Sequence, residues 1–300
     1  MSAVTDAGAR YGVVVRRGAA RVQVGDRMAT RQLITADGHA TAEITKWDPL
    51  LTARVVGFLR PIVKRYFRSE VRGLSHIPAG GALLVSNHSG GMLTTDPPTF
   101  AVSFYDEFGY DRPLLTLSHD VYSRGPTKQF FLRTGFIPAT PGNAAQALAS
   151  DALVMVYPGG DYDAMRPTSK QNVIDFNGRT GYVRAAVEAG VPIVPMVSIG
   201  GQETQLFLSR GTWLAKRLGL KQRLRSEMAP LTFGFPFGLT LGGVNVPLPA
   251  KLVTQVLPPI DIRDQFGISP DIDEIDTHVR TVMQAELNRL VAQRRVPFLG

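Results

Sequence analysis

Two short segments of this 300-residue chain carry side chains that can do chemistry, and each directly follows an apolar run. The first segment, Asn87-His88-Ser89-Gly90-Gly91, follows the run Ala82–Ser86, and a carboxylate comes soon after it at Asp96. An imidazole held by a carboxylate is a competent general base near neutral pH. We therefore expect His88 to be a base oriented by Asp96; the alternative is a histidine that only serves the fold. Candidates for the substrate-binding loop around it are Asn87, Ser89, Gly90 and Gly91.

The second segment, Tyr157-Pro158-Gly159-Gly160-Asp161-Tyr162-Asp163, comes at the end of the apolar run Leu153–Tyr157. A tight glycine-rich loop can present backbone N–H groups to an anionic or polarised oxygen, although Pro-Gly-Gly after a strand can also be only a turn. Ligands of open α/β sheets collect at the carboxyl ends of the strands. Because both segments sit at such ends, we expect them to line one cleft.

The elements that must position these loops follow from the pattern of apolar residues. Strands are predicted at Ala82–Ser86, Pro113–Leu117, Leu153–Tyr157 and Pro192–Ser198, and helices at Lys128–Arg133, Asn143–Ser150, Arg179–Ala189 and from Ser269 onward. Alternation of this kind is typical of a parallel sheet covered by helices. We predict an α/β fold with a mixed, largely parallel central sheet flanked by helices.

An amphipathic helix is predicted ahead of this sheet. Asp48 is a suitable N-cap and Pro49 a suitable first residue, and apolar positions then recur at helical spacing. The helix also carries Arg60, Lys64 and Arg65. It either packs on the core as an ordinary surface helix or lies in a membrane interface.

The composition excludes several classes of protein. Lys plus Arg number 33 and Asp plus Glu 25, which gives a net charge of +8; 44% of residues are hydrophobic and none is cysteine. These values exclude a disordered chain, a disulfide scaffold, thiol nucleophiles and thiolate metal sites. Residues 1–46 read as a partly ordered N-terminal extension, and residues 47–300 as one domain with a substantial core.

Neither a membrane span nor a secretory signal is apparent in the sequence. The apolar runs are far shorter than the about 18–20 residues that a spanning helix needs, and the basic N-terminus lacks an apolar h-region. We therefore expect a peripheral protein on the cytoplasmic side of a membrane. The positive charge suits nucleic acid, anionic lipid headgroups or a phosphorylated substrate.

A second basic segment lies between residues 210 and 225, where cations alternate with Trp213 and several leucines. This mixture suits an anionic membrane surface or the phosphates of coenzyme A, and the alternative is a solvated helix face. Because no nucleic-acid-binding motif accompanies the charge, we expect no nucleic-acid partner. The cations of interest are Arg210, Lys216, Arg217 and Lys221.

Other reaction classes find little support. The chain has no Walker A pattern, no G-x-G-x-x-G and no G-x-S-x-G, which argues against nucleotide-phosphate loops and against an α/β-hydrolase elbow. Histidines and carboxylates never occur at metal-ligand spacing. We expect no metal and no bound cofactor.

With its two loops, the sequence resembles the glycerolipid acyltransferase superfamily, which contains the lysophosphatidic acid acyltransferases. The family's Asn-His-x4-Asp motif is matched by Asn87-His88 and Asp96, and its Pro-Glu-Gly-Thr-Arg motif falls on residues 158–162. Its Val-Pro-Ile-x-Pro strand is Val191–Pro195. Order and spacing agree from about Trp47 to the C-terminus, so the resemblance implies an acyltransferase domain over residues 47–300.

Three departures from the family pattern concern the role of Asp96 and the nature of the acceptor. Seven residues rather than four separate His88 from Asp96, and the third motif is similar to the Pro-Gly-Gly-x-x-Glu variant of enzymes acting on neutral glycerides, with Asp163 in place of the Glu. The arginines that usually hold the acceptor's phosphate in the second and third motifs are missing. Arg is the best residue for bidentate phosphate recognition, so their loss should matter. Cations that can substitute are Arg133, Arg166 and Arg179.

The resemblance implies that His88 removes a proton from an acceptor hydroxyl, which attacks the thioester of acyl-CoA or an acyl-carrier protein. Asp96 would orient His88, and Gly159 and Gly160 would supply oxyanion donors within the loop that also contains Pro158, Asp161 and Asp163. A lysophospholipid or glycerolipid acceptor at the membrane surface is expected, with a mono- or diacylglycerol or another lipid alcohol as the alternative. Functions of another class are a non-catalytic lipid- or acyl-CoA-binding module and an acyl-ester hydrolase.

Overall fold

The computed structural model describes residues 46–91, 94–119, 122, 125–219, 228–242 and 245–294. Nearly all of the expected N-terminal extension lies outside these residues, and so does Lys221 of the basic segment. The expected division of the chain at residue 46 therefore stays a prediction.

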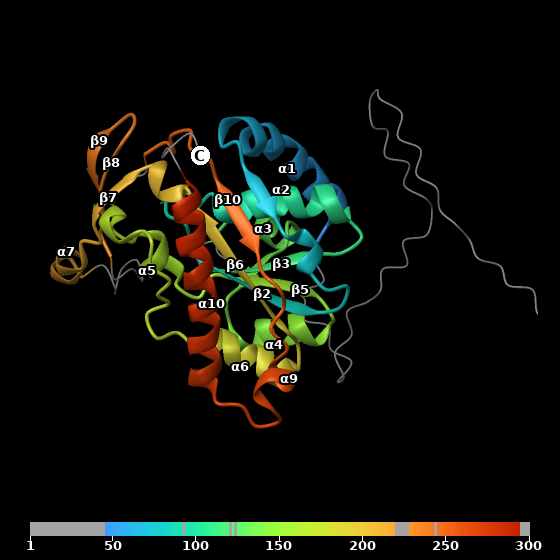
Figure 1. The fold of residues 1–300 in the computed structure, drawn as a ribbon. Coiled ribbons are helices and arrows are strands. Elements are labelled where there is room, and N and C mark those ends of the chain that lie inside the picture. The colour runs from blue at the N-terminus through green and yellow to red at the C-terminus, as the bar shows by residue number, and fades with distance from the viewer. Residues whose placement is uncertain are drawn as a thin grey trace, which may run out of the picture. The chain divides into compact units, whose positions relative to one another are not determined.

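A seven-stranded sheet forms the centre of the domain, in the order β1-β10-β6-β2-β5-β3-β4 (Figure 1). From β6 to β4 the neighbouring strands are parallel, whereas β10 is antiparallel to β6 and parallel to β1 at the edge. The predicted mixed, largely parallel α/β sheet is therefore confirmed. The strands are β1 (Glu70–Arg72), β2 (Ala82–Ser86), β3 (Leu114–Ser118), β4 (Phe136–Pro138), β5 (Leu153–Val156), β6 (Ile193–Ile199) and β10 (Val253–Val256).

Helices cover both faces of this sheet because its central strands are apolar on both sides. On one face, Leu83 and Val85 of β2 belong to a core cluster with residues of α4 (Pro141–Ala149), α6 (Gly181–Ala189) and α10 (Ile272–Gln293). On the other face, Leu84 packs in a cluster with residues of α1 (Pro49–Pro61) and α2 (Asp96–Phe108). Strands buried on both faces read as continuous apolar runs, which is why the sequence predicts them well.

The predicted helix starts are largely confirmed. The Asp48 carboxylate accepts a hydrogen bond from the Leu51 N–H at 2.9 Å and so caps α1, which continues into a π-helical turn, η2 (Ile62–Tyr66). Asp271, rather than Ser269, caps the C-terminal helix α10. Shorter helices are α3 (Lys128–Arg133), α5 (Gly160–Ala164), α7 (Thr212–Arg217) and α9 (Ile262–Phe266).

Several elements were not predicted from the sequence. They include α2, β1, β10, α9, the helix α5 where a loop was expected, and a separate antiparallel sheet of β7 (Leu206–Ser209), β8 (Leu231–Gly234) and β9 (Gly238–Leu241). This small sheet flanks α7, which lies within the basic segment. Among the described residues, no helix is both long and apolar enough to cross a bilayer.

Candidate active site

The two loops singled out in the sequence lie next to each other at the carboxyl edge of the sheet. Strands β2 and β5 are parallel neighbours, and Val85 of β2 is paired with Val156 of β5. The chain leaves β2 toward His88 and leaves β5 toward Pro158 and Gly159. The register therefore brings the imidazole and the glycine-rich loop to one place, while the cleft expected between them stays a prediction.

His88 and Asp96 are in contact although seven residues separate them. The His88 Nδ1 atom lies 3.3 Å from Asp96 Oδ2, and both side chains are largely buried, 11% and 3% exposed. Asp96 is the first residue of α2, so its carboxylate points back toward the loop that it follows. Since a carboxylate accepts hydrogen bonds, this contact favours a proton on Nδ1 and leaves Nε2 as the basic nitrogen.

The other residues of the first loop hold it in place. Ser89 donates to Asp96 twice, from its N–H at 2.9 Å and from its hydroxyl at 2.5 Å, and that hydroxyl also accepts from the Gly201 N–H. The Asn87 amide binds both the N–H and the carbonyl of Ser198 at 2.9 Å. Asn87 and Ser89, expected to bind substrate, are thus buried and occupied by these bonds.

Glycine is required at two positions of this loop. Gly90 and Gly91 have φ angles of 114° and 110°, which side chains with a Cβ rarely adopt. A Cβ on Gly90 would also come within 2.6 Å of the Gln202 side chain, and the Gly91 N–H donates to the Ala164 carbonyl. The two glycines let the loop fold closely against the helix that follows the Pro-Gly-Gly segment.

A buried ion pair joins the second loop to the first. Asp163 Oδ2 accepts a hydrogen bond from the His88 N–H at 2.7 Å, and Asp163 Oδ1 lies 2.8 Å from an Arg166 nitrogen. Both side chains are at most 4% exposed. Burial raises the pKa of Asp163 above its ordinary value, while the Arg166 charge acts in the opposite direction. Through this hydrogen bond, the Asp163–Arg166 pair fixes the backbone at His88.

The aromatic ring of Tyr157 positions the imidazole, a role that the sequence did not reveal. The rings of Tyr157 and His88 are stacked, with centroids 4.1 Å apart and planes 2° apart. Burial raises the pKa of the Tyr157 hydroxyl well above its ordinary value, and the Asp96 charge adds to the shift. Tyr157 is therefore a neutral stacking partner. The available signal was its place where a predicted strand meets the Pro-Gly-Gly segment.

The Pro-Gly-Gly loop is held by Arg179. Its guanidinium donates to the carbonyls of Pro158 and Gly159, at 3.3 and 2.8 Å, and pairs with Asp161 at 3.1 Å. A Cβ on Gly159 would lie 2.4 Å from that of Asp163, so only glycine fits there. The Gly160 N–H donates to the Tyr157 carbonyl at 3.0 Å. Of the two expected oxyanion donors, Gly160 is thus already bonded within its own turn.

Other cations singled out in the sequence lie away from His88. Arg133 precedes β4 and pairs with Asp48 at 2.5 Å, and because the strands are parallel this is the opposite edge of the sheet. In the helical region that follows Asp48, Arg60 pairs with Asp106 and Lys64 donates to Ser103, while Arg65 is exposed.

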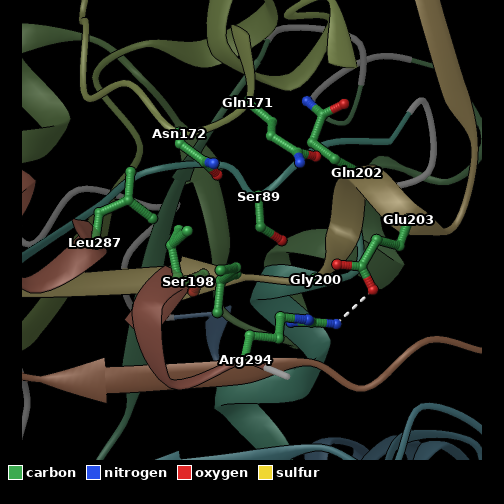
Figure 2. Close-up of a pocket in the computed structure, with 11 residues that line it drawn as sticks. Ser89, Gln171, Asn172, Ser198, Gly200, Gln202, Glu203, Leu287 and Arg294 are labelled. Carbon is green, nitrogen blue, oxygen red and sulfur yellow. Dashed lines mark hydrogen bonds and ion pairs between the residues drawn. The ribbon is translucent and has the colours of Figure 1, made fainter. Parts of the chain in front are cut away.

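A cavity of about 110 Å³, lined by both polar and apolar residues, adjoins the first loop at Ser89 (Figure 2). Its wall includes the carboxyl end of β6 and residues of α10, and Arg294 there pairs with Glu203 at 2.5 Å. The Ser89 hydroxyl, which binds Asp96, faces this cavity, whereas His88 is not among the residues that line it. The cavity therefore lies beside the first loop and does not contain the imidazole.

Comparison with known proteins defines the class of this fold and site. The family model "Acyltransferase" matches residues 68–199, a span that contains both loops. An uncharacterized protein of Mycobacterium tuberculosis is 32% identical over 277 residues, which cover 90% of this chain and 74% of that protein. The chain is an acyltransferase, and it belongs to the glycerolipid acyltransferase superfamily.

Two further relatives bear on the fold and the substrate. A mouse protein named "DGAT1/2-independent enzyme synthesizing storage lipids" is 28% identical over 202 residues, which cover 63% of this chain and 55% of that protein. The crystal structure of the 1-acyl-sn-glycerophosphate acyltransferase PlsC from Thermotoga maritima matches with a TM-score of 0.50 at 16% identity, over 80% of this chain and 81% of that one. The latter shows a shared fold.

Proposed function

We propose that this protein is an O-acyltransferase that moves a fatty acyl chain from a thioester, acyl-CoA or acyl-carrier protein, to a hydroxyl of a lipid acceptor. The observation that carries the proposal is the contact of 3.3 Å between His88 and Asp96 beside the Pro-Gly-Gly loop. A base oriented in this way suits the activation of a hydroxyl group.

In the proposed reaction, Nε2 of His88 accepts the proton of the acceptor hydroxyl, because Nδ1 is turned toward Asp96. The hydroxyl oxygen attacks the thioester carbonyl carbon and forms a tetrahedral intermediate. The carbon–sulfur bond then breaks, and the leaving thiolate takes the proton back from Nε2. Asp96 stabilises the imidazolium that exists between these steps, as carboxylates do for histidine bases.

We assign stabilisation of the oxyanion to the turn after β5. The Gly160 N–H already donates to Tyr157, so Gly159 is the better of the two expected donors. Arg179 holds the carbonyls of this turn and thereby fixes the direction of its N–H groups. A donor positioned before the reaction begins stabilises the transition state without reorganisation.

For the acceptor, we favour a neutral lipid alcohol such as a mono- or diacylglycerol over a lysophospholipid. A phosphate monoester calls for a free guanidinium near His88. Arg166 is buried against Asp163, Arg179 binds loop carbonyls, and Arg133 pairs with Asp48 at the opposite edge of the sheet. The name of the mouse relative, which refers to storage lipids, supports the same choice.

We further propose that the protein works as a peripheral protein at the cytoplasmic face of a membrane. Exposed cations of the first helical region, Arg60, Lys64 and Arg65, and of the basic segment, Lys216 and Arg217, suit anionic headgroups. Arg210, also expected in this role, is half-buried and donates to the Tyr162 carbonyl. The same groups suit the phosphates of coenzyme A.

An assay with palmitoyl-CoA separates these proposals from their alternatives. The purified protein is offered monoacylglycerol, diacylglycerol, lysophosphatidic acid or lysophosphatidylglycerol, and both the ester product and free CoA are measured. We expect CoA release that depends on a neutral acceptor. Release of CoA without any acceptor would indicate a hydrolase. If neither ester nor free CoA is formed, the protein is a binding module. Preference for lysophosphatidic acid would contradict the neutral-acceptor proposal alone.

A further inference from the structure

The small sheet of β7, β8 and β9 presents apolar side chains to solvent. Leu206, Phe233 and Leu239 form one row across the three strands, and with Leu241 they are between 43% and 60% exposed. A half-solvated antiparallel sheet in water normally shows the opposite arrangement, with polar residues outside. Here the outward face is apolar instead.

The inward face of the same sheet carries polar side chains at the alternate positions. Thr232 is fully buried, its hydroxyl lies 2.8 Å from that of Thr240, and the Asn245 amide contacts Thr240 as well. Because neighbouring residues of a strand point to opposite faces, the inward position of Thr232 and Thr240 directs Phe233, Leu239 and Leu241 outward. The exposure follows from the strand register rather than from a frayed end.

The turn of the β8–β9 hairpin continues this apolar surface. Phe235 and Phe237 flank Pro236 and are 63% and 67% exposed. The hairpin projects from the rest of the fold next to β7 (Figure 1). Two exposed phenylalanines at the tip of a projecting hairpin give it a large apolar area that is available for insertion.

The surrounding sequence is strongly basic. Between residues 205 and 246 there are six Lys or Arg and a single acidic residue, Glu227. In α7, Trp213 is 68% exposed, and the Arg217 guanidinium lies 5.5 Å from its ring centroid. Apolar insertion combined with Lys, Arg and Trp is the pattern by which peripheral proteins bind anionic bilayers.

We infer that the surface formed by Leu206, Phe233, Phe235, Phe237, Leu239 and Leu241, called here the hairpin face, docks on an anionic lipid bilayer. The inference deepens the proposed function and rests on it for the source of the lipid acceptor. The sheet is tied to the active-site loop, since the Arg210 guanidinium lies 3.7 Å from the Tyr162 ring centroid and donates to the Tyr162 carbonyl. Docking would therefore bring the bilayer next to the loop after β5.

Vesicle binding of the full chain tests this inference. Co-sedimentation is measured with vesicles of phosphatidylcholine alone and with added phosphatidylglycerol, without substrates, for the wild type and for the F235S/F237S variant. The control is Ile268→Ser, which removes an apolar side chain that is 88% exposed and follows α9, far from the hairpin (Figure 1). A third variant, Phe58→Ser, changes the exposed face of α1.

We expect the wild type and Ile268→Ser to bind the anionic vesicles, and F235S/F237S to bind at least about tenfold more weakly. In a Phe237→Trp variant, brominated lipids should quench fluorescence beyond the wild-type level. Unchanged binding by F235S/F237S, or a loss only in Phe58→Ser, would overturn the inference. The inference would also be overturned if the wild type were a dimer and F235S/F237S a monomer, because the hairpin face would then bind a second copy of the chain. His88→Ala should bind like the wild type, so failure of catalysis and failure of docking are distinguishable.

Discussion

The Asp163 carboxylate accepts a hydrogen bond from the backbone N–H of His88 at 2.7 Å, and so a residue of the second loop holds the base of the first. The other oxygen of the same carboxylate binds Arg166 in a buried ion pair. In the Pro-Gly-Gly-x-x-Glu pattern that the sequence resembles, Asp163 takes the place of the glutamate. Its contacts give this position a defined task, which is to fix the backbone from which the imidazole extends.

The ion pair between Asp163 and Arg166 should show strong coupling in a double-mutant cycle. Removal of one partner leaves an uncompensated buried charge, so Asp163→Asn and Arg166→Met should each lower the free energy of unfolding by about 3–5 kcal/mol. The free energy of unfolding of the double variant should be about 1–3 kcal/mol higher than the sum of the two single losses predicts. Urea denaturation followed by circular dichroism measures this; strictly additive losses would show that the pair is not coupled.

Stacking on Tyr157 should depend on its ring and not on its hydroxyl. Tyr157→Phe keeps the ring 4.1 Å from His88, and we expect kcat within about threefold of the wild type because, within the described part of the chain, the lost hydroxyl makes one weak hydrogen bond, to the Met155 sulfur. Tyr157→Ala should lower stability by about 3–5 kcal/mol through the cavity that it leaves. It should also lower kcat at a temperature where the variant is folded. Equal activity of the two variants would rule out a positioning role for the ring.

Two glycine-to-alanine changes form a matched pair for the Pro-Gly-Gly loop. A Cβ on Gly159 would lie 2.4 Å from that of Asp163, so Gly159→Ala should reduce both stability and acyl transfer. Gly142 lies in α4 with nothing within 4 Å of an added Cβ, and Gly142→Ala should raise stability by up to about 1 kcal/mol. Thermal unfolding measures the stability of the two variants, and the palmitoyl-CoA assay measures their activity. A Gly159→Ala variant as stable and active as Gly142→Ala would contradict the close packing at Gly159.

The sequence predicted the part of the fold that depends on buried apolar runs. Strands β2, β5 and β6 are buried on both faces, so their runs are unbroken, and the loops after β2 and β5 meet because these strands are parallel neighbours. The sequence did not reveal β10, which enters the sheet antiparallel to β6, because Thr254 and Gln255 interrupt its apolar residues and leave no unbroken apolar run.

Side-chain partners were the other limit of prediction. As a residue type, Arg166 fits a phosphate-binding role, and only the three-dimensional contact with Asp163 shows that its charge is already paired inside the protein. The strands β8 and β9 show the same limit, because alternation of Leu or Phe with Thr does not say which set faces inward. By contrast, the spacing of seven residues between His88 and Asp96 did not prevent their contact, because Asp96 begins a helix directly behind the loop.

Acyl transfer by His88→Ala is the most direct test of the account. This variant and the wild type are compared in the palmitoyl-CoA assay with mono- and diacylglycerol, after circular dichroism has shown that both are folded. General-base catalysis contributes about 10²–10⁴-fold to rates, so we predict that His88→Ala loses at least about 10²-fold in kcat. Ester formation at the wild-type rate by folded His88→Ala would contradict the central claim that His88 is the base.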